Sequence, residues 1–265
     1  MSAGPVNGYL VCGGLYHDMD FARLELLKLL AEHERIRVKV GSDYADRSQI
    51  EAADFLVTYT CNVLPRAEEQ EALRTFLARG GRWLALHGTN SVLEYLKGRG
   101  WNAPREAPRF MEMLGSQFIA HPPIRPYRVE ISDPAHPLTR ALQPFESDDE
   151  LYLCEYHGDA HALLHTHFRG AAPGFIEDTW PRPRDADDRQ LVMYLHAHGG
   201  GEVLYCTLGH CRGKYDMRPM MPEYPTVERG SWKLPVYYEL LRRGIRWAAA
   251  LSEEVADGGR LHATA

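Results

Sequence analysis

The first third of the chain alternates short apolar runs with segments of helical periodicity, and this alternation is the feature that most restricts the fold. Runs that we interpret as buried strands cover residues 9–14, 36–40, 54–60 and 82–86. Between them lie two amphipathic helices, one with Phe21, Leu24, Leu27 and Leu30 at helical spacing behind Asp18 or Asp20, and one over residues 65–79. Continuous apolar strands separated by such helices are typical of a parallel sheet covered on both faces. We therefore predict an α/β fold.

The remainder of the chain is more mixed. Strands are expected over residues 127–131, 151–155, 162–166, 191–195 and 202–208, and helices over residues 107–114 and 235–251. Several connections are too short for a helical crossover, so some strand pairs should be antiparallel. Two long loops, residues 168–189 and 211–234, are typical of lids. We expect one domain over residues 1–265, with its core at 9–250 and a disordered tail at 252–265.

Composition excludes several classes of partner. The net charge of -6 argues against binding to nucleic acid or to an anionic membrane. No apolar run approaches the roughly 20 residues that span a bilayer. The five cysteines have no paired spacing, which favours a reducing, cytoplasmic location. A P-loop and a GxGxxG motif are both missing, so no nucleotide cofactor is expected. The composition leaves open whether the protein forms a homo-oligomer.

Histidines stand where predicted strands end. In "WLALHGTN", residues 83–90, an apolar run stops at His87. Because ligands bind beyond the carboxyl ends of parallel strands, this is a favoured place for a functional side chain. Three further histidines and one carboxylate occupy comparable positions, and we predict that all five side chains gather around one cavity: His17, His87, His121, Glu150 and His210.

Each of these residues also has an ordinary structural interpretation. A single histidine at a strand end is often only a hydrogen-bonded rim residue. Asp148, beside Glu150, is expected in a solvated acidic turn. The pairs His165/His167 and His196/His198 have a spacing that binds metals in extended chain, but both lie near loops where solvent satisfies them.

Six ordered sequence blocks carry a resemblance to a known family. They are "LALHGTNS" (84–91), "FIAHPP" (118–123), "ISDPAHPLTRAL" (131–142), "DDELYL" (148–153), "GGGEVLYCTLGH" (199–210) and "LLRRGIRWAA" (240–249). Together they resemble the ThuA-like, or trehalose-utilisation, family. The resemblance implies a fold similar to that of class I glutamine amidotransferases, which is a flavodoxin-like three-layer α/β sandwich with a mostly parallel sheet and added antiparallel strands.

The same resemblance implies which chemistry is missing. Glutamine amidotransferases place a nucleophilic cysteine in a sharp turn after a strand, and "LALHGTN" is the equivalent turn here. No cysteine occurs between Asn62 and Glu150. Without a thiolate at this turn, glutaminase activity is not expected.

The family is associated with carbohydrate use, often beside dehydrogenases that make keto-sugars, so the expected partner is a small carbohydrate or glycoside. A carbonyl acidifies the adjacent C–H bond, so a base and an electrophile can drive isomerisation, or elimination of a glycosidic leaving group. We expect the catalytic residues, which are also the ligands of a Zn²⁺ or Mn²⁺ electrophile, to be His87, His121, His210 and Glu150. Metal-free proton transfer is the alternative. The expected substrate-binding residues are His17, Asn90, Tyr152 and Trp101.

Two other functions fit the sequence. One is a non-catalytic sugar-binding or regulatory module that kept the amidotransferase-like fold without its thiol. The other is an amide hydrolase that uses a cysteine from elsewhere, such as Cys61 or Cys211. The stretches 182–190 and 215–225 match no block of the family, and they can reshape the pocket for a different substrate.

Overall fold

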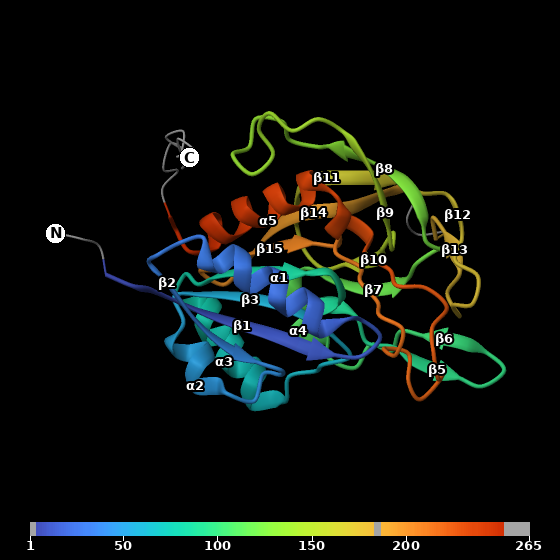
Figure 1. Ribbon diagram of the computed structural model, residues 1–265, viewed down its shortest axis with the longest axis horizontal. Coiled ribbons are helices and arrows are strands. Elements are labelled where there is room, and N and C mark those ends of the chain that lie inside the picture. The colour runs from blue at the N-terminus through green and yellow to red at the C-terminus, as the bar shows by residue number, and fades with distance from the viewer. Residues whose placement is uncertain (1–3, 183–186, 252–265) are drawn as a thin grey trace, which may run out of the picture.

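A mixed sheet runs through the protein, as the computed structural model of residues 4–182 and 187–251 shows (Figure 1). The predicted tail at 252–265 lies outside these residues. The nine-stranded sheet has the order β2 (Ile36–Gly41), β1 (Val6–Gly14), β3 (Phe55–Cys61), β4 (Arg82–Leu86), β15 (Gly201–Cys206), β14 (Arg189–His198), β11 (His161–His167), β8 (Arg125–Ile131), β9 (Phe145–Asp149). Strands from β2 to β15 are parallel, and those from β14 to β9 are antiparallel.

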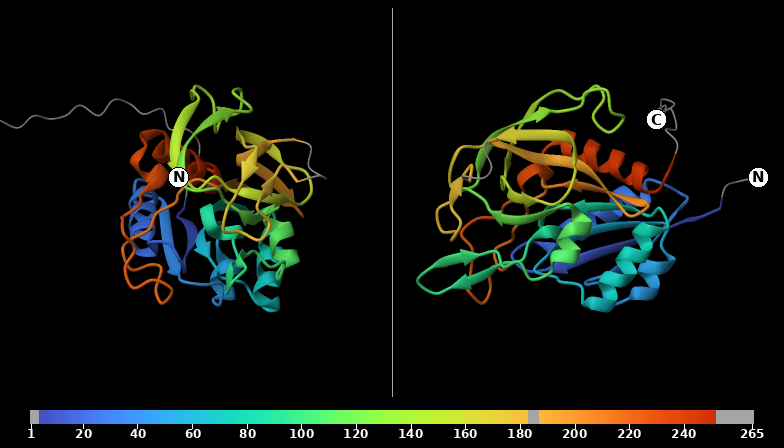
Figure 2. Two further views of the ribbon diagram at one scale, coloured as in Figure 1. Left: turned by 90° about the vertical axis from the view of Figure 1, so that its right-hand side faces the viewer. Right: turned by 180° about the vertical axis from the view of Figure 1, so that it is seen from behind.

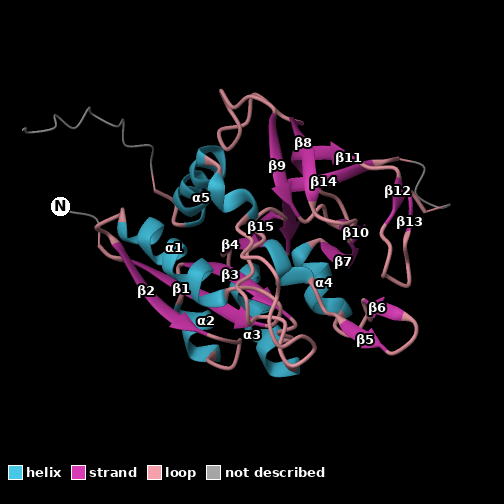
Figure 3. Ribbon diagram, turned by 45° about the vertical axis from the view of Figure 1, so that its right-hand side comes forward, coloured by secondary structure: helices cyan, strands magenta, loops and turns pink. Residues whose placement is uncertain are grey.

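Helices cover both faces of the parallel half and give three layers (Figures 1 and 3). On one face lie α1 (Met19–Ala31) and α5 (Pro235–Ala248), and on the other lie α2 (Arg47–Ala52), α3 (Ala67–Ala78) and α4 (Pro108–Leu114). The predicted α/β sandwich with added antiparallel strands is confirmed.

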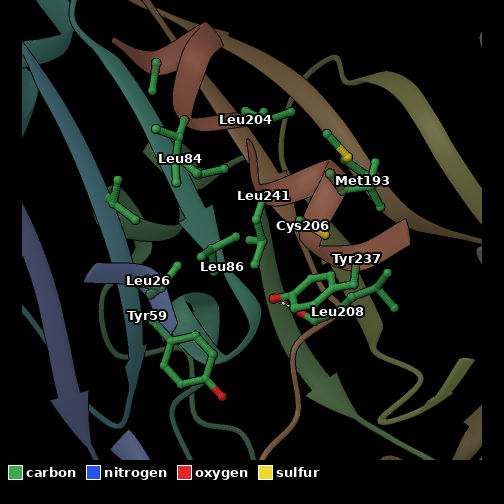
Figure 4. Packing of buried hydrophobic residues seen from close by; sticks show 14 of the residues in the cluster. Leu26, Tyr59, Leu84, Leu86, Met193, Leu204, Cys206, Leu208, Tyr237 and Leu241 are labelled. Carbon is green, nitrogen blue, oxygen red and sulfur yellow. Dashed lines mark hydrogen bonds between the residues drawn. The ribbon is translucent and has the colours of Figure 1, made fainter. Parts of the chain in front are cut away.

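The apolar cores follow from the predicted helix periodicity. Leu26 of α1 and Tyr237 and Leu241 of α5 pack with Leu84 and Leu86 of β4 (Figure 4). Burial of a side chain of this size contributes roughly 1.5–3 kcal/mol. The packing holds the parallel strands in register, so the loops at their carboxyl ends start from a rigid base.

Local capping explains where the first helix begins. Of the two predicted caps, Asp18 is the one used, because its side chain accepts a hydrogen bond from the backbone N–H of Phe21 at 3.1 Å. Asp20 lies in the first turn instead. Pro235 occupies the first turn of α5, where a missing N–H costs nothing.

Several elements differ from the sequence predictions. Helix α2 has one buried residue, Ile50, and the strands of the hairpin β5 (Glu94–Leu96) and β6 (Gly100–Asn102) are three residues long with no buried residue, so neither has a clear apolar pattern. Strand β9 carries the acidic run that we expected to be a turn. The strand expected at 151–155 is β10 (Leu153–Tyr156), which pairs with β7 (Ser116–Ala120) outside the main sheet.

The two predicted long loops contain short regular pieces. Residues 168–189 include β12 (Gly170–Ala171) and β13 (Thr179–Trp180), while residues 183–186 lie outside the described part of the chain. Residues 211–234 include the 3-10 turn η2 (Gly230–Lys233). Within residues 4–182 and 187–251, no helix has the length and apolar character that a membrane crossing requires.

The glycine turn after β1 is closely packed. Gly14 has a φ of +118°, and a Cβ atom there would lie 1.9 Å from the carbonyl oxygen of Cys61. This approach lets the chain turn from β1 across the ends of the neighbouring strands, toward His17.

We predict that Gly14→Ala lowers the free energy of unfolding by about 3 kcal/mol or more, because backbone must move. Gly98→Ala is the matched control: its φ is also positive, at +76°, but no atom lies within 4 Å of the added carbon. It should lose only about 1–2 kcal/mol. Urea denaturation of both variants measures the difference, and equal losses would show that close packing at Gly14 is unimportant.

Candidate functional site

Buried side chains from distant parts of the chain form one compact cluster beyond the carboxyl ends of the parallel strands. They are His17, His87, Glu150 and His210, and one nitrogen or oxygen atom of each lies within 4.8 Å of those of the others. His121 stands at the edge of this cluster, with its Nε2 3.7 Å from Oε1 of Glu150. The structure therefore brings together all five residues that the sequence analysis groups around one cavity.

Each of these residues follows the end of a strand. His17 follows β1, and His87 begins the 3-10 turn η1 (His87–Asn90) directly after β4. His210 lies in the loop after β15, Glu150 comes directly after β9, and His121 directly after β7. The parallel strands β1, β4 and β15 bring His17, His87 and His210 to one edge of the sheet. Glu150 and His121 follow strands of the second half of the chain, which close over this edge.

The turn at His87 is sharp. Its φ of 45° lies in the left-handed region, which is uncommon for a residue other than glycine and costs of order 1–3 kcal/mol. The hydroxyl of Tyr205 donates to the His87 carbonyl oxygen at 2.5 Å and holds the turn. An imidazole thus occupies the turn where the amidotransferase resemblance places a nucleophilic cysteine.

Backbone carbonyls fix the tautomers of the histidines. A carbonyl oxygen only accepts, so Nδ1 of His87 must donate to Thr207 at 2.8 Å, and Nδ1 of His17 to Leu15 at 3.2 Å. This leaves the Nε2 of each ring without a proton. Such a hydrogen bond behind the ring is the usual support of a metal-binding histidine.

The two bare nitrogens face each other. Nε2 of His87 lies 2.9 Å from Nε2 of His17, and 3.5 Å from Oε2 of Glu150. Two lone pairs at this distance repel unless a proton or a cation lies between them. Two nitrogen ligands of one tetrahedral Zn²⁺, each at about 2.0–2.1 Å, lie roughly 3.3 Å apart, so a small movement of either ring would admit the ion. The spacing therefore suits a shared cation.

His210 completes the cluster between two carboxylates. Its Nε2 lies 2.8 Å from Oε2 of Glu228 and must donate to it. Its Nδ1 lies 3.1 Å from Oε1 of Glu150, but the direction is not that of a hydrogen bond, and Nδ1 has no other partner among the described residues. Burial lowers the pKa of His210, but Glu150 and Glu228 outweigh it and raise that pKa to about 9.

The other charges of the cluster suit a cation as well. Burial lowers the pKa of His17 to about 3, so its ring is neutral at pH 7. Burial alone would raise the pKa of Glu150, but the neighbouring His210 and His121 hold it well below its usual range. The neutral ring of His17 and the ionised Glu150 are in the protonation states that metal ligands require, whereas His210, whose pKa is raised to about 9, would release its Nδ1 proton when a cation binds.

His121 occupies a different position from the buried ligand set. Its Nδ1 donates to the carbonyl of Pro122 at 2.8 Å, so Nε2 is bare. The side chain is 23% exposed, and it lines the cavity. Burial lowers the pKa of His121, which keeps its ring neutral. The geometry thus puts His17 inside the compact set and His121 at its open side, whereas the sequence analysis placed them the other way round.

A cavity of about 280 Å³ opens onto the cluster. Its lining includes three of the residues predicted to bind substrate, His17, Tyr152 and Trp101, together with Arg212. The Tyr152 hydroxyl lies 3.3 Å from Nε2 of His87, and burial raises the pKa of Tyr152 well above 10. Nη2 of Arg212 lies 3.3 Å from Oε1 of Glu150. The polar end of the cavity therefore offers hydroxyl and guanidinium donors beside bare imidazoles.

The structure places other candidates away from the cavity. Asn90 is fully buried, and its Nδ2 donates to Ser116 Oγ at 2.7 Å, which is a packing role. His165 lies 2.7 Å from Ser132 Oγ, and both ring nitrogens of His196 face backbone carbonyls. These are structural contacts. His167 pairs with Asp188, and His198 packs beside His196. Two aromatic residues that could also pack on a sugar ring lie outside the cavity lining: Trp180 is buried in a separate apolar cluster, and Tyr215 is exposed.

Cysteine chemistry is disfavoured by burial. Cys61 lines the cavity, and burial raises its thiol pKa. Burial likewise raises the pKa of Cys211 to about 12. Because the thiolate is the nucleophile, a thiol that stays protonated at pH 7 is a poor one. The amide-hydrolase interpretation has no support here.

Three supporting residues were missed by the sequence analysis. Asp149 is buried and accepts hydrogen bonds from the backbone N–H groups of Gly209 (3.0 Å), His210 (3.1 Å) and Ser231 (2.9 Å), and from the Ser231 hydroxyl. Glu228 and Arg212 are the others; they pair at 3.0 Å. The only sequence signal was the adjacency of Asp149 to Glu150 in an acidic run.

The chain matches the model of the ThuA family, described as trehalose utilisation, over residues 10–222. Among solved structures, a ThuA-like protein from Parabacteroides merdae is similar at 15% identity and a TM-score of 0.65, covering 92% of this chain and 90% of that one. One from Bacteroides uniformis has 15% identity and a TM-score of 0.64, with 96% and 95% covered. Among curated proteins, no sequence matches.

A third similarity is to a larger enzyme. A cold-adapted β-galactosidase from Rahnella sp. R3 has 12% identity and a TM-score of 0.55, and the match covers 94% of this chain and 32% of that one. At these identities the solved structures show a shared fold.

We predict that Asp149→Asn lowers the free energy of unfolding by about 2–4 kcal/mol, because an amide NH₂ would face N–H groups in a buried site. The adjacent Asp148→Asn is the control, since Asp148 is exposed, and it should change stability by no more than about 0.5 kcal/mol. Chemical denaturation compares the two variants. A loss for Asp149→Asn no larger than that for Asp148→Asn would contradict the supporting role.

Proposed function

We propose that this chain, which belongs to the ThuA family of trehalose utilisation, is an enzyme that acts on a keto-sugar or a related glycoside by acid–base chemistry assisted by a divalent cation. The observation that carries the proposal is the convergence of unprotonated imidazole nitrogens on one ionised carboxylate. His17, His87, His210 and Glu150 fit a Zn²⁺ or Mn²⁺ ion in number and spacing, and His210 would give up its Nδ1 proton to bind it.

Glu228 and the backbone carbonyls complete this fit. Each ligand histidine donates its second N–H to an oxygen atom, which orients the ring and makes the bare nitrogen more basic. A bound divalent cation would act as a Lewis acid, polarising a substrate carbonyl and stabilising the charge that develops on its oxygen.

His121 is the residue we assign as the base. Its bare Nε2 faces the cavity, beside Glu150 but at the open side of the ligand set. It removes the proton from the carbon next to the substrate carbonyl, and the ring takes up that proton on Nε2. Arg212 lies close enough to Glu150 to donate to an oxygen atom held at the same place.

The fate of the resulting enolate defines the reaction class. In isomerisation, the proton returns to the former carbonyl carbon and the hydroxyl on the deprotonated carbon passes its proton to the enolate oxygen, so the carbonyl moves to the neighbouring carbon. In elimination, the C–O bond breaks on the carbon attached to the deprotonated carbon, and the leaving glycosidic oxygen takes the proton back from His121 and departs as an alcohol. Addition of water across the new C=C bond then completes hydrolysis. The assigned residues suit all three outcomes, because each begins with the same proton transfer.

Location and partners belong to the same proposal. The five cysteines are all free thiols and buried, which fits a reducing, cytoplasmic environment. A small carbohydrate or glycoside is the proposed partner, and a homo-oligomer is compatible with it.

We predict that chelator-treated protein binds one equivalent of Zn²⁺ or Mn²⁺, and that His87→Ala weakens binding by about 100-fold or more because it removes a ligand. The control is His161→Ala, which removes an exposed histidine paired with Asp133 and should bind like wild type. Isothermal titration calorimetry measures both. Equal affinities in His87→Ala and wild type would exclude this metal site.

For the reaction, we predict that His121→Ala lowers kcat by about 10²–10⁴-fold on 3-keto-glucosides, since it removes the base. Cation binding should persist in this variant, because the compact ligand set is intact. Product analysis with circular dichroism as a fold check provides the measurement. Unchanged turnover would contradict the assignment of the base, and saturable sugar binding without product in wild type would favour the non-catalytic module.

A further inference from the structure

We infer that the cavity takes a glycoside with a single-ring aromatic aglycone, in preference to a disaccharide such as trehalose. The inference rests on the proposed function, in that it names the substrate class of the same site. The supporting observation is that the side chains lining the cavity change from polar near the cluster to mainly apolar and aromatic toward the mouth.

The inner end of the cavity is polar. His17, His121, Glu150 and Arg212 line it, and the Tyr152 hydroxyl points to the same place through its contact with His87. Their donors and acceptors suit the carbonyl and hydroxyl groups of one sugar ring.

Beyond this end, the walls are aromatic. The ring of Phe118 packs against Tyr152 with centroids 4.6 Å apart and against Phe175 at 5.9 Å, and Phe175 packs on His121 at 5.0 Å. On the hairpin side, the ring of Trp101 packs on Tyr16 at 5.4 Å. Aromatic rings packed edge-to-face in this way leave faces for a further flat ring.

Trp101 is held firmly although its hairpin projects from the body of the protein (Figure 2). Its backbone N–H donates to Gly174 O at 2.8 Å, and its carbonyl accepts from the N–H of Ile176 at 2.9 Å. These bonds tie β6 to the segment that carries Phe175. The two walls of the cavity are therefore fixed relative to each other.

The mouth is apolar as well. The hairpin β5–β6 contributes Trp101 to the lining, and the loop of residues 211–229 contributes Met217. Exposed apolar side chains also stand on these two segments, outside the lining itself: Tyr95, Tyr215, Met220 and Met221 are 40–56% exposed.

A second sugar fits this outer part poorly. Its hydroxyls would face mainly Leu93, Trp101, Pro173, Phe175 and Met217, whose side chains offer one donor, the Trp101 indole N–H. The hydroxyls of Tyr16 and Tyr224 are the further hydrogen-bonding groups of this part of the lining. Hydroxyls that lose water without gaining hydrogen bonds are costly. The volume of about 280 Å³ is also slightly below the roughly 300–1,000 Å³ of drug-sized sites, which suits one sugar and one small ring.

The test compares three 3-keto-glucosides that differ only in the aglycone: phenyl, methyl and glucosyl. We expect kcat/KM for the phenyl glycoside to exceed the others by about tenfold or more. Because phenol is also the better leaving group, only the part of this preference that a subsite variant removes is assigned to burial of the ring. Trp101→Ala and, as a second variant, Phe175→Ala should bring the phenyl-to-methyl ratio toward one. Trp247→Ala is the matched control, because Trp247 packs on Arg82 at the opposite ends of the strands, and it should preserve the ratio.

Binding of the ordinary phenyl and methyl glucosides, measured by calorimetry, separates this inference from the proposed function. Equal kcat/KM for the three keto-glucosides, or a glucosyl preference, overturns the inference and leaves the proposed function intact. If no keto-glucoside is turned over, the proposed function fails and binding decides. Phenyl glucoside binding about tenfold tighter than methyl, with the difference lost in Trp101→Ala, supports the aromatic subsite, and equal Kd values overturn it.

Discussion

The buried carboxylate of Asp149 is the interaction on which the site depends. It gathers backbone N–H groups from the loop after β15 and from η2, and it does so from the last residue of β9. A buried carboxylate is costly unless such donors surround it. The same donors thereby fix the position of His210, and the next residue along the chain, Glu150, is aimed at the cluster. One charge thus joins the antiparallel half of the sheet to the parallel half.

The cluster itself has an unusual balance of donors and acceptors. In most buried polar networks each lone pair meets a hydrogen atom, but here His17 and His87 direct lone pairs at each other beside an ionised Glu150. The Nδ1–H groups of both rings are already used on backbone carbonyls, so the hydrogen atom or positive charge between the rings has to come from an added proton, a bound cation or the Tyr152 hydroxyl, 3.3 Å from Nε2 of His87. The cluster could therefore hold a cation.

Sequence reasoning was strongest where regular structure controls position. The parallel strands could be predicted from their apolar runs, and His17, His87 and His210 followed because carboxyl ends of such strands share one edge. Prediction from the sequence failed where the position of a side chain depends on the path of a loop. Glu228 and Arg212 meet across a long loop whose path has no periodic signal, and Asp149 was hidden because a buried carboxylate and a solvated one look alike in sequence. The sequence could not show that His17 lies inside the compact set and His121 at its open side, because the depth of a side chain within a cavity depends on the tertiary structure.

The loop between Arg212 and Glu228 is closed at its base by two backbone hydrogen bonds, of 3.0 and 2.8 Å, between these two residues. Their side chains contact Glu150 and His210, whereas Met217 and Tyr224, further out on the loop, line the cavity. The contacts with the cluster and the contacts with the outer cavity thus come from separate stretches of one loop. Substitutions in the outer stretch can therefore change the lining of the cavity without disturbing the contacts that Arg212 and Glu228 make with the cluster.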